Sequence, residues 1–228
     1  MFSYLDHLEC TECGKSYPSN GLIGISPCCG KVLFARYDLA RIRREVDRDE
    51  LQTRRTDMWR FAELLPVEDP DRIVSLGEGG TPLLAAVELG RRLGVNSLYI
   101  KEEGLNPTGS FKARGISAAV ARAVELGAPG FTIPSAGNAG GAAAAYCARA
   151  GLTTKVFMPQ DAPEANKKEC LLAGSDLTLV EGLISDAGRQ AAAVAQEQSL
   201  FDLSTLKEPY RAEGKKTMGL EIAMQLGW

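Results

Sequence analysis

From Ser97 to the end of the chain, short apolar runs alternate with alanine-rich segments that have helical periodicity and end in glycine. This alternation limits the choice of fold more than any other pattern in the sequence. Strands that alternate with helices of about 10–15 residues are typical of βαβ units, which build parallel sheets. The sequence therefore predicts an α/β protein. The expected strands are S-L-Y-I, G-F-T-I, T-K-V-F-M, L-T-L-V and S-L-F-D-L.

Length and charge exclude several classes of protein. The 228 residues suffice for one or two domains with a buried core, and the net charge is −3. That mild acidity argues against a nucleic-acid partner or an anionic membrane surface. No apolar run approaches the ~20 residues of a membrane span, and the start M-F-S-Y-L-D-H-L-E-C lacks the order of a secretory signal. Four of the six cysteines lie in the first 29 residues, which is no disulfide framework, so we expect a reducing cytoplasm.

The chain before Ser97 has a different character, and its end looks interrupted. A charged stretch, Asp38–Arg48, predicts a helix. The last residues, Q-L-G-W, directly follow a helical stretch, Met218–Leu226, where an α/β chain is expected to continue with a loop and a strand. We therefore expect this sequence to be part of a longer one.

A lysine lies near the start of one predicted helix. On a helical projection of S-F-K-A-R-G-I-S-A-A-V-A-R-A-V-E-L-G, Lys112 shares the apolar side with Ile116 and Val120. Arg114 and Arg122 are expected on the solvent side. Burial of an ammonium favours the neutral amine, a nucleophile that forms Schiff bases with aldehydes. From periodicity alone, a lysine that extends its ammonium to solvent is the favoured interpretation.

The neighbours of Lys112 make the first interpretation more specific. Gly109 permits a tight approach and Ser110 is a candidate N-cap, so the lysine would lie on a rigid element. The stretch N-P-T-G-S-F-K-A-R-G, Asn106–Gly115, resembles the cofactor-lysine motif of the fold type II pyridoxal-phosphate enzymes, most closely that of the threonine synthase family. The resemblance implies that Lys112 holds pyridoxal 5'-phosphate and that Ser110 contacts it. Ala113 departs from the motif, because many members have Asp there.

A second motif, I-P-S-A-G-N-A-G-G-A-A-A-A-Y, follows the strand expected to end at Ile133. Its loop leads into a helix of small residues, whose free N–H groups favour an anion. In isolation this is an ordinary βα turn. The resemblance implies that the loop binds the substrate carboxylate and that Asn138 also contacts the cofactor hydroxyl. The loop residues are Ser135, Ala136, Gly137, Asn138 and Ala139.

Three further stretches match the same family in the same order along the chain. They are G-E-G-G-T-P-L (Gly77–Leu83), F-M-P-Q-D-A-P-E-A-N-K (Phe157–Lys167) and P-Y-R-A-E-G-K-K-T (Pro209–Thr217). Singly, each is ordinary loop chemistry, and Glu78 would be a solvated loop acid. Together they extend the resemblance from roughly residue 30 to the end.

The resemblance implies a fold with a small three-layer αβα domain, part of a large domain and a Cys-rich N-terminal extension. Residues 1–35 would form the ribbon-like extension and 36–108 the N-terminal part of the large domain. Residues 109–208 would form the small domain with Lys112, and 209–228 the start of the return into the large domain.

The resemblance also implies an activity. The threonine synthase family converts O-phosphohomoserine, an amino-acid substrate, and water to threonine and phosphate, and we expect a homodimer for the full-length protein. Lys112 would then move the Cα and Cβ protons. Arg211 and Lys207 are candidates to bind the substrate phosphate. Thr205 and Glu208 replace asparagines that family members often carry, which leaves the neighbouring contacts open. Lys101, Lys215 and Lys216 are weaker candidates.

In this family, the glycine-rich loop that binds the cofactor phosphate lies on a strand beyond the equivalent of residue 228. A phosphate without its backbone N–H donors binds poorly. We therefore expect this chain alone to bind pyridoxal phosphate weakly and to have little or no activity.

The cysteine-rich start is similar to half of a zinc ribbon. In E-C-T-E-C-G-K-S-Y the pattern C-x-x-C-G is typical of a zinc knuckle, whereas the second half, S-P-C-C-G-K, lacks the two-residue spacer. Cys10, Cys13 and one or both of Cys28 and Cys29 are candidate ligands of a structural zinc ion, with His7 as an outside candidate. His7 is the only histidine.

Two alternative functions stay open. One is another fold type II enzyme, such as a threonine or serine dehydratase or a cysteine synthase. The other is a non-catalytic interaction or zinc-ribbon module that retains the fold. The stretch Gly77–Leu83 and the Cys-rich start favour the threonine synthase family over the first. Intact Lys112 and Asn138 argue against the second.

Overall fold

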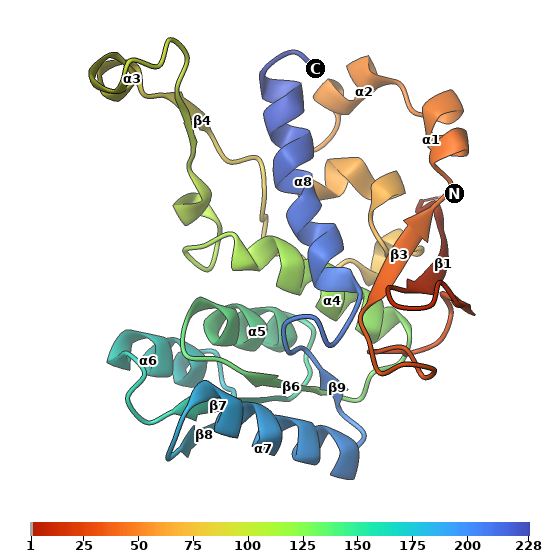
Figure 1. Cartoon of the computed structure of the whole chain (residues 1–228), viewed down its shortest axis with the longest axis vertical. Helices are drawn as coiled ribbons and strands as arrows, with labels where there is room; N and C mark the ends of the chain where they lie inside the picture. The colour runs from red at the N-terminus through yellow and green to blue at the C-terminus, as the bar shows by residue number, and fades with distance from the viewer. Residues whose placement is uncertain (1) are drawn as a thin grey trace.

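The computed structural model describes residues 2–228 and contains a four-stranded parallel sheet in the order β8-β7-β6-β9 (Figure 1). Its strands are β6 (Phe131–Pro134), β7 (Thr154–Pro159), β8 (Asp176–Val180) and β9 (Phe201–Asp202). These are four of the five expected strands, and all three pairings are parallel. The predicted α/β class is therefore confirmed.

Helices cover both faces of this sheet. Helices α5 (Asn138–Arg149) and α6 (Glu164–Leu172) lie on one face, and α7 (Ile184–Glu197) lies on the other (Figure 1). Parallel strands need such crossover connections, because a tight turn reverses the chain. The result is the three-layer αβα arrangement that the family resemblance implies.

The fifth expected strand lies elsewhere. Strand β5 (Tyr99–Lys101) pairs antiparallel with β4 (Leu83–Ala85) in a separate two-stranded sheet. The short helix α3 (Val87–Leu93) lies between them, and this arm extends from the rest of the molecule (Figure 1). An apolar run predicts a strand but does not identify the strand with which it pairs.

Helix α4 (Lys112–Glu125) lies between two other helices, with α5 on one side and α8 (Tyr210–Gln225) on the other (Figure 1). Helices α4 and α8 touch through their backbones. A Cβ atom at Gly214 would overlap the carbonyl oxygen of Arg114 and lie 2.9 Å from the Cα atom of Gly115. Two glycines at one level therefore allow this close crossing.

The expectation that Arg114 and Arg122 face solvent is wrong. Both side chains are buried, and Arg114 is 0% exposed. Arg114 pairs with Glu103 and Glu221, which belong to other elements. A helical projection shows only the helix itself, so it assigns a cation to solvent even when neighbouring elements supply carboxylates that offset its desolvation.

The N-terminal region is a small antiparallel sheet in the order β2-β1-β3. The charged stretch after it, expected as one helix, forms two helices, because Asp47 starts a new one by accepting from Asp49 N at 2.9 Å. The remaining elements are β1 (Leu5–Cys10), β2 (Ser16–Pro18), β3 (Leu33–Tyr37), α1 (Leu39–Glu45), α2 (Arg48–Thr53) and the 3-10 helices η1 (Met58–Leu64), η2 (Pro70–Arg72) and η3 (Glu103–Leu105).

The helix expected at Met218–Leu226 is the C-terminal part of α8. Because α4 packs against α5 and also against α8, the expected domain boundaries near residues 108 and 208 stay a prediction. Across residues 2–228, no helix combines the length and the apolar character that crossing a bilayer requires.

Candidate active site

Lys112 is the first residue of α4 and is half-buried. Its Nζ lies 3.8 Å from the centroid of the Phe111 ring. Within the described residues, no carboxylate lies within 4 Å of this ammonium. Burial lowers the pKa of Lys112 from its ordinary value, and the positive charge of Arg211 lowers it further. Lys112 therefore has a larger fraction of neutral amine than a surface lysine.

Ser110 lies one position before its expected place in the helix cap. The N-cap position of α4 is occupied by Phe111, whose side chain makes no capping bond. The Ser110 Oγ instead accepts from the backbone N–H of Lys112 at 3.3 Å. The preceding turn needs Gly109, which has a φ of +65°. Ser110 therefore still supports the first turn, displaced by one residue from the prediction.

Helix α8 brings two more cations to this end of α4. Arg211 and Lys215 are separated by one helical turn and lie close to the glycine crossing. The Nζ of Lys215 lies 5.9 Å from the centroid of the same Phe111 ring. Burial lowers the pKa of Lys215, as do the charges of Arg211 and Lys112. Three cations therefore share one region, and the charge of Arg211 lowers the pKa of both lysines.

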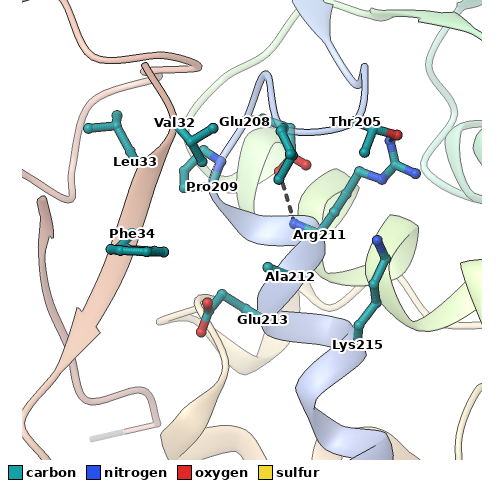
Figure 2. Close-up of a pocket in the computed structure, with 11 residues that line it drawn as sticks. Val32, Leu33, Phe34, Thr205, Glu208, Pro209, Arg211, Ala212, Glu213 and Lys215 are labelled. Carbon is teal, nitrogen blue, oxygen red and sulfur yellow. Dashed lines mark hydrogen bonds between the residues drawn. The ribbon is translucent and has the colours of Figure 1, made fainter. Parts of the chain in front are cut away.

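Arg211 has hydrogen-bonding capacity that the described residues leave unused. Figure 2 shows its guanidinium extended toward Thr205. Nη1 donates to the Leu203 carbonyl oxygen at 2.5 Å and to Thr205 Oγ1 at 3.4 Å, whereas Nε has no partner among residues 2–228. The residue is 4% exposed. A buried guanidinium N–H without an acceptor is costly, so an anionic ligand at this position would be stabilised.

Glu208 faces the cations but balances them only in part. Its Oε2 accepts from the backbone N–H groups of Tyr210 and Arg211 at 2.6 and 2.9 Å, and its Oε1 has no partner in the described chain (Figure 2). Burial raises the pKa of Glu208 to about 7, although Arg211 and Lys215 oppose this. The negative charge of Asp202 opposes the lowering of the pKa of Arg211 by burial. At neutral pH, Glu208 is therefore partly protonated and the region keeps excess positive charge.

Lys207 does not join this group, although it was a candidate for the substrate phosphate. It is exposed and lines a separate hollow with Gly24 and with side chains of α7. Lys215, the weaker candidate, takes its place beside Arg211. The spacing of four residues within α8 was the signal in favour of Lys215, because such residues share one helix face. Lys207 precedes that helix.

The two other weaker candidates have carboxylate partners. Lys101 Nζ donates to Glu221 Oε2 at 2.8 Å, and Lys216 pairs with Glu213. These partners balance their charge, so neither lysine adds to the excess positive charge beside Lys112.

The loop Ser135–Ala139 joins β6 to α5. Ser135 is buried, and its Oγ accepts from the N–H groups of Gly137 and Gly140 at 3.2 and 2.9 Å. Asn138 is exposed, and its Oδ1 accepts from Asn166 at 3.4 Å. Among residues 2–228, the N–H groups of Asn138 and Ala139 have no protein acceptor. The loop therefore presents free donors at a helix N-terminus, whereas Ala136 is simply exposed.

Glu78 holds α4 and α5 together and is not the solvated loop acid of the alternative interpretation. Its carboxylate is fully buried. It accepts from Ser117 of α4 at 2.5 Å, from Tyr146 of α5 at 2.8 Å and from Trp59 Nε1 at 2.8 Å. The sequence of the loop gives no sign of this role, because Ser117, Tyr146 and Trp59 are distant from Glu78 in the chain. The hydroxyl of Ser75, three residues upstream, also donates to this carboxylate.

The order of contacts along residues 68–78 shows how the two helices run. This segment meets α4 first at Glu125 and then at Ser117. It meets α5 first at Arg149 and then at Tyr146. Along this segment, the contacts move from the C-terminal toward the N-terminal part of each helix. The two helices therefore run in the same direction. The predicted cofactor lysine and the carboxylate loop therefore begin their helices at the same end of the packed pair, although no hydrogen bond joins them within the described residues.

The four N-terminal cysteines form a separate cluster. The Sγ atoms of Cys10, Cys13, Cys28 and Cys29 all lie within 4.8 Å of one another. His7, the outside candidate, is not in this cluster, and its Nδ1 lies 2.7 Å from a carboxylate oxygen of the adjacent Asp6.

Comparisons with known proteins identify one family for most of the chain. A family model described as "Pyridoxal-phosphate dependent enzyme" matches residues 74–227. Threonine synthase of Methanocaldococcus jannaschii is 39% identical over 221 residues, which cover 96% of this chain and 54% of that relative. Threonine synthase of Methanosarcina acetivorans is 37% identical, with coverage of 96% and 53%. The chain thus spans about half the length of the curated relatives it matches.

Solved structures of the same fold are also similar. The processed form of threonine deaminase isoform 2 from Solanum lycopersicum superposes with a TM-score of 0.60 and 27% identity, covering 80% of this chain and 47% of that one. A pyridoxal 5'-phosphate-dependent aspartate racemase gives a TM-score of 0.59 and 28% identity, with coverage of 64% and 46%.

The described residues fit such a cofactor. Lys112 offers an amine without an ionic partner, whose lowered pKa suits bonding to an aldehyde. The start of α5 offers free N–H donors for the carboxylate of an amino acid. Both groups lie inside the stretch that the family model matches. On the match and the geometry together, this chain belongs to the family of pyridoxal-phosphate-dependent enzymes.

Proposed function

We propose that this chain provides the lysine, the carboxylate loop and the phosphate-binding cations of a threonine synthase-type lyase. The proposed reaction converts O-phosphohomoserine and water to threonine and phosphate. The observation that carries the proposal is the convergence of Lys112, Arg211 and Lys215, with excess positive charge, at the crossing of α4 and α8. Relatives named threonine synthase, 37–39% identical, support it.

In this proposal Lys112 holds the cofactor and moves protons. Pyridoxal phosphate, when bound, supplies an electron sink for the carbon atoms next to the substrate amine. Lys112 takes and returns protons at the substrate Cα and Cβ atoms, and its lowered pKa favours the neutral form that accepts them. Phe111 packs its ring against this amine.

The loop Ser135–Ala139 holds the substrate carboxylate through its free N–H groups. Ser135 keeps the loop in shape by accepting from two of its other N–H groups. Asn138 is assigned to the cofactor hydroxyl. Its present hydrogen bond to Asn166 is long, at 3.4 Å, so little is lost when the amide exchanges partners.

Arg211 and Lys215 bind the phosphate that leaves the substrate. The free Nε of Arg211 is a donor suited to phosphate, and Lys215 adds a point charge one turn away. A dianion beside three cations relieves their mutual repulsion and raises their pKa values. A dehydratase substrate has no phosphate and gains nothing from these cations, so they favour a phosphorylated substrate.

The test uses the protein that contains these residues in its full natural length. Phosphate release from O-phosphohomoserine is compared with ammonia release from serine and threonine. We expect phosphate release to dominate, and Lys215→Met to raise KM for O-phosphohomoserine at least tenfold. Lys207→Met is the matched control and is expected to leave KM unchanged. Faster ammonia release, or equal effects of the two variants, would contradict the proposal.

Three further parts of the function are proposals of the same kind. The family resemblance places the cofactor-phosphate loop outside residues 1–228, so we propose that these residues alone bind pyridoxal phosphate weakly. A spectrophotometric titration that gives micromolar binding would contradict this. We also propose a homodimer for the whole protein and a reducing cytoplasmic location, which suits six free cysteines. A structural zinc ion at the N-terminal cluster is a separate proposal that does not depend on the lyase chemistry.

A further inference from the structure

Two turns in the N-terminal region, residues 10–15 and residues 26–31, have the same backbone hydrogen bonds, although their sequences differ. In each turn the first residue donates its N–H to the carbonyl oxygen of the sixth, at 2.9 and 2.8 Å. The first residue also accepts from the N–H of the fifth, at 3.0 and 2.8 Å. The fifth residue is a glycine with a positive φ in both cases.

The repeat explains the irregular spacing of the cysteines. When the turns are aligned, Cys13 corresponds to Cys29, and Cys10 corresponds to Ser26, 16 residues further along the chain. The second turn is therefore a C-x-x-C-G knuckle whose first cysteine is serine. Cys28 is an additional cysteine at the third position of the turn, which is why the second half reads C-C-G.

The sulfur atoms are close enough to share one ion. All four lie within 4.8 Å of one another, and the Cys13 and Cys28 sulfurs are 3.4 Å apart. Four thiolates around tetrahedral zinc, with Zn–S bonds of about 2.3 Å, have sulfurs about 3.8 Å apart. The Ser26 Oγ lies 3.2 Å from the Cys10 sulfur, at the edge of the same cluster.

We infer that Cys10, Cys13, Cys28 and Cys29 bind one zinc ion, with Cys28 supplying the thiolate that the knuckle pattern would place at Ser26. A site with four protein ligands has no open position for a substrate, so its role is structural. The surrounding sheet has few buried apolar side chains, among them Leu8 and Leu33. Such a small unit gains much of its stability from a metal.

The zinc unit, which is the β2-β1-β3 sheet together with the turns that carry the four cysteines, also touches residues 203–208, the segment before Arg211. A Cβ atom at Gly24 would lie 2.7 Å from the Lys207 carbonyl oxygen, so the two backbones are in direct contact. Residues 32–34 of the unit line one small pocket together with Arg211 (Figure 2). The ion therefore fixes Gly24 and residues 32–34, against which residues 203–208 pack. This consequence for Arg211 rests on the proposed function, whereas the metal site itself does not.

The first experiment measures metal content in the purified chain, expressed with zinc in the medium. We expect about one zinc per chain in the wild type and in Cys170→Ala, the control at a cysteine outside the cluster. Cys28→Ser is expected to lose zinc to a chromogenic chelator at least tenfold faster. The double variant Ser26→Cys with Cys28→Ser is expected to restore slow release, because it rebuilds the regular knuckle.

Cobalt provides a readout that does not depend on the stability of the variants. Titration of the metal-free wild type with Co²⁺ is expected to give the visible bands of tetrahedral thiolate coordination at one equivalent. Disulfides among the four cysteines, iron in place of zinc, or a Cys28→Ser variant that releases zinc as slowly as the wild type would each overturn the inference. Failure of the double variant to recover slow release would overturn the assignment of Cys28.

The contact with the Arg211 segment is tested by hydrogen exchange. Removal of zinc is expected to speed exchange at least tenfold in residues 22–34 and also in residues 203–208, whereas α6 stays unchanged. Faster exchange in residues 22–34 alone would overturn the coupling and leave the metal site standing. Hydrogen exchange does not depend on enzyme activity. A failure of this inference can therefore be distinguished from a failure of the proposed lyase function.

Discussion

Two groups of charges lie close to the α4–α8 crossing, and they differ in balance. In the first, Arg114 donates to Glu103 at 2.7 Å and to Glu221 at 2.7 Å, and Lys101 donates to Glu221 at 2.8 Å. Two cations face two carboxylates, and the pKa of Arg114 is raised by its carboxylate partners in spite of burial. This group is a closed network that gains nothing from a further ion.

The second group begins two residues earlier, at Lys112, and includes Arg211 and Lys215. Here the pKa of each cation is lowered, with burial as the main cause, and Glu208 is only partly ionised at neutral pH. Both groups are at least half-buried, and each has members on α4 and on α8. Burial of charge therefore does not by itself identify a ligand site, and the absence of compensating charge is the more informative property.

Breaking the balanced group should have the largest effect on stability. Arg114→Met leaves two buried carboxylates without their main partner, and we expect the free energy of unfolding to fall by about 3–5 kcal/mol. Lys112→Met, the matched change in the second group, should alter it by less than about 1 kcal/mol. Urea denaturation monitored by circular dichroism measures both. Equal losses would show that the two groups do not differ in the way described.

Separating the helices tests whether the crossing holds both groups. Gly214→Ala places a Cβ against the Arg114 carbonyl oxygen and should lower the free energy of unfolding by about 1–3 kcal/mol. Gly219→Ala is the control in the same helix, because a Cβ there meets no atom within 4 Å. It should raise the free energy by about 0.5–1 kcal/mol. Thermal unfolding distinguishes the two, and a neutral Gly214→Ala would refute the close crossing.

The dependence of the free energy of unfolding on pH should reveal the raised pKa of Glu208. Its pKa of about 7 in the folded protein exceeds the 4.5 of an unperturbed glutamate, so between these values the folded state binds more protons. Its contribution to the free energy of unfolding is therefore present at low pH and falls as pH rises through this window, by at most about 1.4 kcal/mol per unit.

Glu208→Gln should remove this slope while keeping an acceptor for the N–H groups of Tyr210 and Arg211. Urea titrations at several pH values between 4.5 and 7 measure it. An identical pH profile in the variant and the wild type would mean that Glu208 is ionised throughout.

Inorganic phosphate should give the smallest effect and the sharpest distinction between the groups. At three times its Kd, a ligand of the folded state stabilises by about 0.8 kcal/mol. We expect this increment in the wild type and in Lys101→Met, which belongs to the balanced group, and not in Lys215→Met. Differential scanning fluorimetry with sulfate and chloride series measures the shift in Tm. An increment that persists in Lys215→Met would place the anion elsewhere.

The sequence was sufficient for the elements whose evidence is local. Four parallel strands follow from apolar runs between helices, and the helical pattern also predicts that Lys112 lies in the first turn of α4. The pattern fails where the deciding partner is distant in the chain. A projection of one helix predicts Arg114 in solvent, because it cannot include Glu221, which is 107 residues away in the chain.

Other misses have the same cause. The four-residue spacing of Arg211 and Lys215 is visible in the sequence, but the crossing of α8 with α4, which brings both beside Lys112, is not. The strand Tyr99–Lys101 has the composition of a sheet strand, yet its partner is the antiparallel β4. The relation of Ser26 to Cys10 depends on backbone hydrogen bonds, which residue types alone do not reveal.

Glu78 has a practical consequence for anyone who wishes to produce the sheet and its helices as a separate piece. Its carboxylate is the acceptor for hydroxyl groups at positions 117 and 146, deep inside that piece. A fragment that begins at residue 109 would carry both hydroxyls without it, and each orphaned donor would weaken the interior by about 1–3 kcal/mol. A usable fragment must therefore start upstream of residue 74, so that it contains Glu78 and also Val74, whose carbonyl oxygen accepts from Ser117.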